Sequence, residues 1–117
     1  AARAAYAGRR IIACFQPHLF SRTRDFATDF GQALAAADAL FLCDIYPARE
    51  QPMPGGTSQR IADATARAGH APTWMGPRSA AAGALARFVH AGDVVLTIGA
   101  GDVTKTGPEL LERLDQP

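Results

Sequence analysis

One short segment, residues 16–24, gathers side chains that could bind a negatively charged group. It holds an imidazole, two guanidiniums and two hydroxyls, supplied by His18, Arg22, Arg24, Ser21 and Thr23. Arginine pairs bidentately with carboxylate or phosphate, and the N-terminus of a following helix adds positive potential. The segment therefore predicts an anion site. The alternative is that Ser21 or Thr23 only caps the helix while both arginines are solvated, and spacing alone does not decide between the two.

Two further segments carry residues that could line a cleft together with residues 16–24. Asp44 ends an apolar run and could hold a metal-bound water or an arginine, although such an acid more commonly satisfies loop N–H groups. Residues 99–106 nearly match the phosphate-cradling pattern G-x-x-x-x-G-K-[ST], but Thr104 stands where the second glycine is required. We therefore expect a tight turn there instead of a phosphate loop. The cleft-lining candidates are Asp44, Tyr46, Gly99, Gly101 and Asp102.

The rest of the chain offers little that could complete an active site. Arg49, Glu50 and Gln51 could pair across the cleft or with each other, and surface pairing of little energetic value is the favoured interpretation. The sequence shows no nucleophile with its base, no paired carboxylates and no metal-ligating cluster. We therefore expect no catalytic residue and no metal site in this chain.

The elements that must position these segments alternate between strand and helix patterns. Apolar runs predict strands over residues 11–15, 39–46, 72–75 and 93–98. Amphipathic patterns predict helices over residues 1–7, 23–37, 57–68, 79–89 and 109–114. The first long helix is expected to turn Phe26, Phe30, Ala33 and Leu34 inward. This order predicts a Rossmann-like three-layer α/β/α fold with a mostly parallel sheet, in which the candidate segments meet at the carboxyl ends of the strands.

Composition narrows the class of protein. The chain has 117 residues, 12 basic and 11 acidic side chains, and 48% hydrophobic residues, which fits one domain. A net charge of +1 argues against a nucleic-acid binder, and no apolar run approaches the length of a membrane span, so we expect a cytoplasmic protein. Cys14 and Cys43 lie in apolar runs and are expected to be small buried hydrophobes. The chain opens on a helix pattern without a capping residue, so we expect it to be a fragment of a longer protein.

Four motifs follow one another in an order that is diagnostic. They are Phe15-Gln16-Pro17-His18 with Phe20-Ser21-Arg22-Thr23-Arg24-Asp25, then Asp44-Ile45-Tyr46-Pro47-Ala48-Arg49-Glu50, then Pro54-Gly55, and finally Gly99-Ala100-Gly101-Asp102. In this order and at this spacing they resemble the C-terminal domain of a Mur ligase, over residues 1–117. The first block is the specific part, since it resembles the branch of the family that adds L-alanine.

The resemblance implies a three-domain enzyme of peptidoglycan precursor synthesis that joins L-alanine to UDP-N-acetylmuramate through an acyl phosphate. An N-terminal domain would bind the UDP-sugar, and a central ATPase domain would hold most of the contacts to ATP and Mg²⁺. The present chain would close over both domains and would be inactive alone. By position, His18 and Arg22 match residues expected near the L-alanine carboxylate, with Ser21 and Arg24 beside them.

Two departures from the family pattern and two alternatives remain. Leu19 stands where many members have a second arginine, so a carboxylate clamp would depend on Arg22, helped by Arg24. The resemblance implies a first strand before Ala1 that is missing here. We therefore expect the isolated chain to self-associate through exposed sheet edges, to recruit a strand or to be only marginally stable. The alternatives are a ligase that recycles murein peptides onto the same UDP-sugar, and a non-catalytic α/β module that binds an anionic small molecule.

Overall fold

The computed structural model describes residues 5–99 and 101–115 and shows a single parallel sheet. The four strands lie in the order β3-β2-β1-β4, and every neighbouring pair is parallel. The strands are β1 (Ile11–Phe15), β2 (Ala39–Cys43), β3 (Trp74–Gly76) and β4 (Val94–Ile98). The predicted parallel sheet is thereby confirmed. Residues 1–4 of the helix predicted over residues 1–7 lie outside the described residues, and of residues 5–7 the structure shows only Ala5 as helical.

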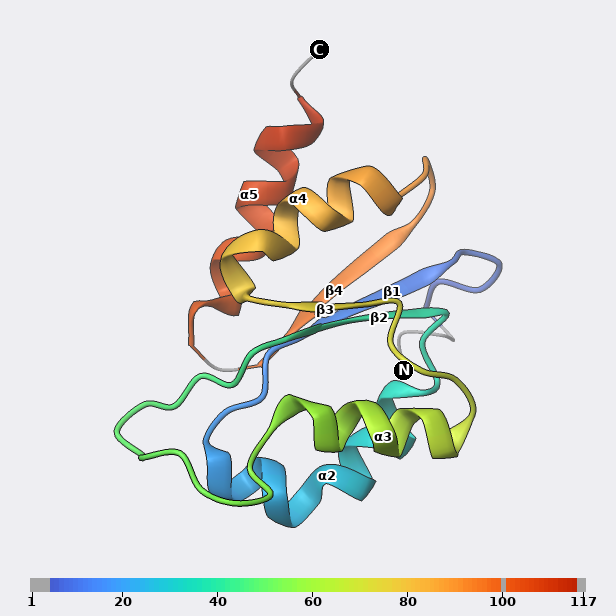
Figure 1. Cartoon of the computed structure of the whole chain (residues 1–117). Coiled ribbons are helices and arrows are strands. Elements are labelled where there is room, and N and C mark those ends of the chain that lie inside the picture. Colours follow the sequence, from blue (N-terminus) through green and yellow to red (C-terminus); the bar gives the residue numbers. More distant parts are fainter. Residues whose placement is uncertain (1–4, 100, 116–117) are drawn as a thin grey trace.

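Helices cover both faces of the sheet, as the alternating pattern predicts. One pair of helices packs on one face of the sheet and a second pair on the other, which gives three layers (Figure 1). The first pair is α2 (Phe20–Leu34) with α3 (Ser58–Ala68), and the second is α4 (Arg78–Phe88) with α5 (Thr106–Leu114), which follows the short 3₁₀ helix η1 (Asp102–Lys105). No helix in the described part of the chain is long and apolar enough to cross a membrane.

The two central strands are buried on both faces, and their side chains alternate between two cores. Ile12, Cys14 and Phe41 pack in the core with α4 and α5. Ala13 and Leu40 pack in the core with α2 and α3. This alternation follows from the twofold period of a strand, so an uninterrupted apolar run is what a strand covered on both faces requires.

The inward face of α2 differs from the prediction. Phe26 is 47% exposed, and its backbone leaves helical geometry at φ −118° and ψ 15°. Leu34 is buried as predicted and Phe30 packs partly buried against the core, but Ala33 is exposed. The other buried positions of the helix are small residues, namely Thr23, Ala27 and Gly31. The physical reason is the close approach of α3, since a Cβ added to Gly31 would lie 2.7 Å from the backbone carbon of Ala64. A phenylalanine on that face would hold the two helices apart.

The edge strand β4 is more exposed than its apolar sequence predicts. Its last two residues are exposed, and Ile98 keeps 38% of its surface in contact with solvent. Its one partner in the described part of the chain is β1, so the other edge of β4 has no strand against it there. A strand of this composition is typical of a sheet interior.

The contact between α2 and α3 gives a first prediction. Gly31→Ala should lower the free energy of unfolding by about 1–3 kcal/mol, because the added methyl group would collide with Ala64. Gly107→Ala in α5 is the matched control, because a Cβ there meets no atom within 4 Å. Urea unfolding of the two variants measures the difference, and equal stabilities would contradict this account of the helix contact.

Candidate functional site

The loops after β1 and β2 lie side by side at the carboxyl edge of the sheet. The backbone N–H of Tyr46 donates to the carbonyl of Pro17 at 2.8 Å, and the N–H of Leu19 donates to the carbonyl of Tyr46 at 2.9 Å. The rings of His18 and Tyr46 stack with centroids 5.9 Å apart. β2 ends at Cys43, three residues before the predicted end at Tyr46. The parallel pairing between the two chain segments resumes at an isolated bridge between His18 and Tyr46.

The loop after β4 joins the same edge through two glycines. A Cβ on Gly101 would lie 2.7 Å from the ring of Tyr46, and a Cβ on Gly99 would collide with the carbonyl oxygen of Gln16. Both glycines also have positive φ, at 135° for Gly99 and 95° for Gly101. This confirms the tight turn expected from the sequence, although Ala100 lies outside the described residues. Val103 in η1 is 1% exposed and packs into the core.

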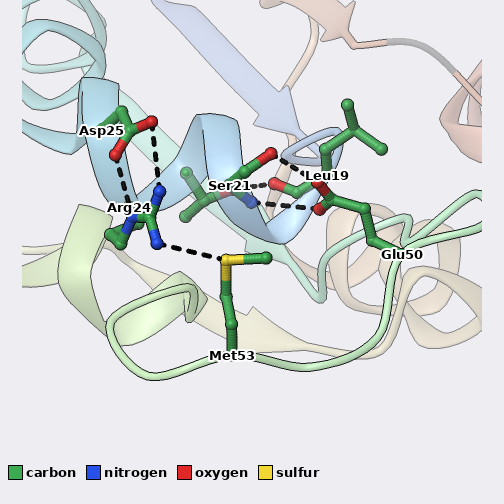
Figure 2. Close-up of polar contacts among 7 residues, drawn as sticks. Leu19, Ser21, Arg24, Asp25, Glu50 and Met53 are labelled. Carbon is green, nitrogen blue, oxygen red and sulfur yellow. Dashed lines mark hydrogen bonds and ion pairs between the residues drawn. The ribbon is translucent and has the colours of Figure 1, made fainter.

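The first turn of α2 receives a carboxylate from the chain itself. Glu50 accepts hydrogen bonds from the backbone N–H of Ser21 at 3.0 Å and from the Ser21 hydroxyl (Figure 2). These bonds hold the pKa of Glu50 below its usual range. Of the pairings expected for Glu50, the structure shows bonds to a residue of another segment, Ser21 of α2, and none to Arg49 or Gln51. The reason is that the loop after β2 carries Glu50 across to a helix start 29 residues earlier in the chain.

The hydroxyl of Thr23 has a local role in the same turn. Its Oγ1 donates to the carbonyl of Leu19 at 2.8 Å, and its backbone N–H donates to the same carbonyl at 3.2 Å. Neither Ser21 nor Thr23 acts as the N-cap, because that position is Leu19, which has no polar side chain to offer.

The two arginines of the segment differ in their surroundings. Arg24 pairs with Asp25, with Nε 2.8 Å from Oδ1, and also contacts the sulfur of Met53 (Figure 2). Asp25 raises the pKa of Arg24 by hydrogen bonding and charge. By contrast, the side chains of Arg22 and His18 make no hydrogen bond or ion pair with any residue that the structure describes. Arg22 is exposed and His18 half-buried. These two groups are therefore open to an incoming anion.

A cleft of about 340 Å³ lies beside this region, and several of the predicted cleft residues line it. Asp44, Tyr46 and Asp102 line it together with Gln16, which is 3% exposed and whose Oε1 has no partner in the described part of the chain. These residues come from the three loops that the sequence predicts to converge.

Arg78 is the cleft residue that sequence reasoning missed. Its backbone N–H donates to Asp44 Oδ1 at 3.1 Å, and its Nε lies 3.4 Å from Asp102 Oδ2. Its Nη1 also donates to Glu109 Oε1 at 2.7 Å. The usable signal was its position at a helix start directly after the weak strand β3, which ends at the same edge of the sheet. Asp44 therefore accepts a backbone N–H at the start of α4, where the sequence favoured a loop N–H group as its partner.

The described residues at this edge form neither a Mg²⁺ site nor a glycine-lined phosphate cradle. The described residues contain no group of three or more His, Cys, Asp or Glu side chains arranged to hold a metal ion. Asp44 and Asp102, the acids nearest to such a role, both face Arg78. Residues 102–105 form a 3₁₀ helix whose Val103 side chain points into the core, so this segment presents no glycine-lined cradle for phosphate.

The two cysteines lie below the site and are inert by burial. Cys14 and Cys43 are each 0% exposed, with their sulfur atoms 3.9 Å apart across β1 and β2. The hydrogen bond between the two thiols, together with burial, raises the pKa of Cys43, and the same hydrogen bond lowers the pKa of Cys14. Their prediction as small buried hydrophobes is confirmed by their complete burial.

Sequence comparison agrees with this architecture and with the motifs at its edge. A family profile described as "Mur ligase, glutamate ligase domain" matches residues 1–101. The chain therefore belongs to the Mur ligase family. It is 52% identical over 116 residues to the UDP-N-acetylmuramate--L-alanine ligase of Cutibacterium acnes, which covers 98% of this chain and 25% of that protein.

Further relatives carry the same name. Identity is 52% over 114 residues to the UDP-N-acetylmuramate--L-alanine ligase of Streptomyces griseus, covering 97% of this chain and 24% of that enzyme. Identity is 48% over 107 residues to the UDP-N-acetylmuramate--L-alanine ligase of an Anaeromyxobacter species, covering 92% of this chain and 23% of that enzyme. The chain thus spans about a quarter of the length of the relatives it matches.

The carboxylate at the start of α2 makes stability depend on pH. Because the pKa of Glu50 is lower in the folded than in the unfolded chain, its contribution is present above the unfolded-state pKa and is lost as the pH falls through the folded-state pKa. Glu50→Gln should therefore be less stable than the wild type near neutral pH, with the gap closing below about pH 4.3. Urea unfolding across this range measures the gap, with the exposed Glu112→Gln as control. A gap that does not change with pH would contradict the assignment.

Proposed function

We propose that this chain is the C-terminal lobe of a longer cytoplasmic ligase that joins L-alanine to UDP-N-acetylmuramate in peptidoglycan precursor synthesis. The observation that carries the proposal is that His18 and Arg22, at the carboxyl edge of the sheet, make no hydrogen bond or ion pair with a described residue. Both lie within the motif that resembles the L-alanine branch of the family. The names of the relatives support the same substrates. ATP and Mg²⁺ would be held mainly by the remainder of the protein, because the described residues of this lobe form neither a metal-ligating cluster nor a phosphate cradle.

The chemical task of this lobe would be to orient the amino acid. An α-amino acid presents a carboxylate that takes no part in amide formation and an amine that must attack the activated acid. A guanidinium fork on the carboxylate fixes that end of the molecule and restricts the directions open to the amine. Arg22 is suited to the carboxylate, and the imidazole of His18, held against the ring of Tyr46, can donate a second hydrogen bond. Arg24 is less suited to bind the substrate carboxylate, because its guanidinium is already paired with Asp25.

The binding role of Arg22 is testable in the full-length enzyme. Arg22→Ala should raise the KM for L-alanine by about 10- to 100-fold, which corresponds to a lost charged hydrogen bond of about 1.5–3 kcal/mol. The KM for ATP should change little, because the substituted group is assigned to the amino acid. Steady-state kinetics with each substrate varied in turn measures the split. Arg67→Ala, an exposed arginine of α3, is the control. An unchanged KM for L-alanine would remove Arg22 from this role.

If ATP and Mg²⁺ are held mainly by the remainder of the protein, the isolated chain should have no ligase activity. The 117-residue chain supplied with ATP, Mg²⁺, UDP-N-acetylmuramate and L-alanine should release no phosphate above a protein-free blank. The reason is that the residues described here contain neither a phosphate cradle nor a metal-ligating cluster. Phosphate release by the chain alone, measured against the full-length enzyme as the positive control, would overturn the proposal that the chemistry resides in the remainder of the protein.

A further inference from the structure

Besides the local bonds of Thr23 to the Leu19 carbonyl, the first turn of α2 is held in place by the loop after β2, residues 44–57. Its N-cap, Leu19, has no polar side chain and adopts φ 69° and ψ 140°, a conformation that costs a non-glycine residue about 1–3 kcal/mol. The first turn also contains no acidic residue of its own to offset the helix dipole. Such a helix start needs partners from elsewhere in the fold.

The loop 44–57 supplies these partners at three points. Tyr46 accepts the N–H of Leu19 at 2.9 Å, and Glu50 accepts both the N–H and the hydroxyl of Ser21. Farther along, the backbone at Gly56 packs directly on Phe20, since a Cβ there would lie 2.7 Å from the Phe20 carbonyl oxygen. Of the three contacts, the carboxylate of Glu50 is the one made by a charged side chain (Figure 2).

We propose that Glu50 is a positioning residue, which fixes the first turn of α2 through Ser21 and thereby sets the place of Arg22 for the amino-acid carboxylate. This inference rests on the proposed function, because it takes Arg22 as the binding group. Ser21 and Arg22 are consecutive, so a displacement of the Ser21 backbone moves the origin of the Arg22 side chain. A displacement of about 1 Å at a group that orients a substrate is enough to weaken binding severely.

The charge of Glu50 contributes in a second way. Its carboxylate occupies the N–H group of Ser21 at the positive end of the helix, and it interacts electrostatically with Arg24. An incoming carboxylate therefore meets a helix start that is already neutralised. The attraction that remains in this segment comes from the guanidinium of Arg22 and from His18, neither of which is paired within the described residues. Glu50 thus directs the anion to those two groups.

A double-mutant cycle in the full-length enzyme tests this assignment. The variants are Glu50→Ala, Arg22→Ala and the double substitution, with Glu50→Gln as the conservative variant and Glu112→Gln as a remote control of the same chemistry. Glutamine can accept from the Ser21 N–H and donate to the Ser21 hydroxyl, so it keeps the geometry while removing the charge. Each variant is characterised by the KM for L-alanine, ATP and UDP-N-acetylmuramate, and by kcat.

Glu50→Ala should raise the KM for L-alanine about tenfold and leave the other two KM values within about twofold. Glu50→Gln should recover most of the loss, and Glu112→Gln should match the wild type. If Glu50 acts through Arg22, the double variant should be no worse for L-alanine than Arg22→Ala alone. If Glu50→Ala does not fold, Ser21→Ala, which removes one of the two hydrogen bonds, enters the cycle in its place with an expected rise of about threefold.

The outcomes that overturn the inference differ from those that overturn the proposed function. An unchanged KM for L-alanine in Glu50→Ala, an equal rise in all three KM values, or losses that multiply in the double variant would each remove Glu50 as a positioning residue. In those cases Arg22→Ala still shows its own effect on L-alanine. If Arg22→Ala leaves the KM for L-alanine unchanged, the proposed site fails, whatever Glu50 does.

Discussion

The backbone contact between the loops after β1 and β2 is the constraint on which the rest of the site depends. The bonds between Tyr46 and residues 17–19 continue the pairing of two buried strands beyond their ends. They set where α2 begins, and they bring the ring of Tyr46 against both His18 and Gly101. Because β1 and β2 are covered on both faces, this edge is held by the core below it and does not rest on the loops alone.

The charged groups at this edge fall into two sets, those that bond to other described residues of the chain and those that do not. Glu50 is used at the helix start, Arg24 pairs with Asp25, and Arg78 connects three acidic residues. The open groups of the first segment are Arg22 and His18. This distribution explains how a chain with balanced charge can still present a local receptor for an anion, since the receptor needs only that its own cation lacks a partner.

Much of the architecture follows from local patterns, and the departures have a common cause. The order of strands and helices, the parallel sheet, the buried cysteines and the turn at Gly99 could all be predicted from apolar runs and glycine placement. The orientation of Phe26 could not, because it depends on how closely α3 packs against Gly31. The role of Glu50 and the position of Arg78 could not be predicted either, because their partners lie 29 and 34 residues away in the sequence.

The sequence by itself determined the fold class, the family and the residue types gathered in the segment 16–24. Periodicity and motif order are properties of the sequence alone, so they can be recognised without knowing which segments lie in contact in the fold. Only the tertiary structure decided which of those charged groups remain available. The physical reason is that an arginine is open or neutralised according to the carboxylates that other loops bring to it. Asp25 reaches Arg24, whereas no described residue pairs with the guanidinium of Arg22.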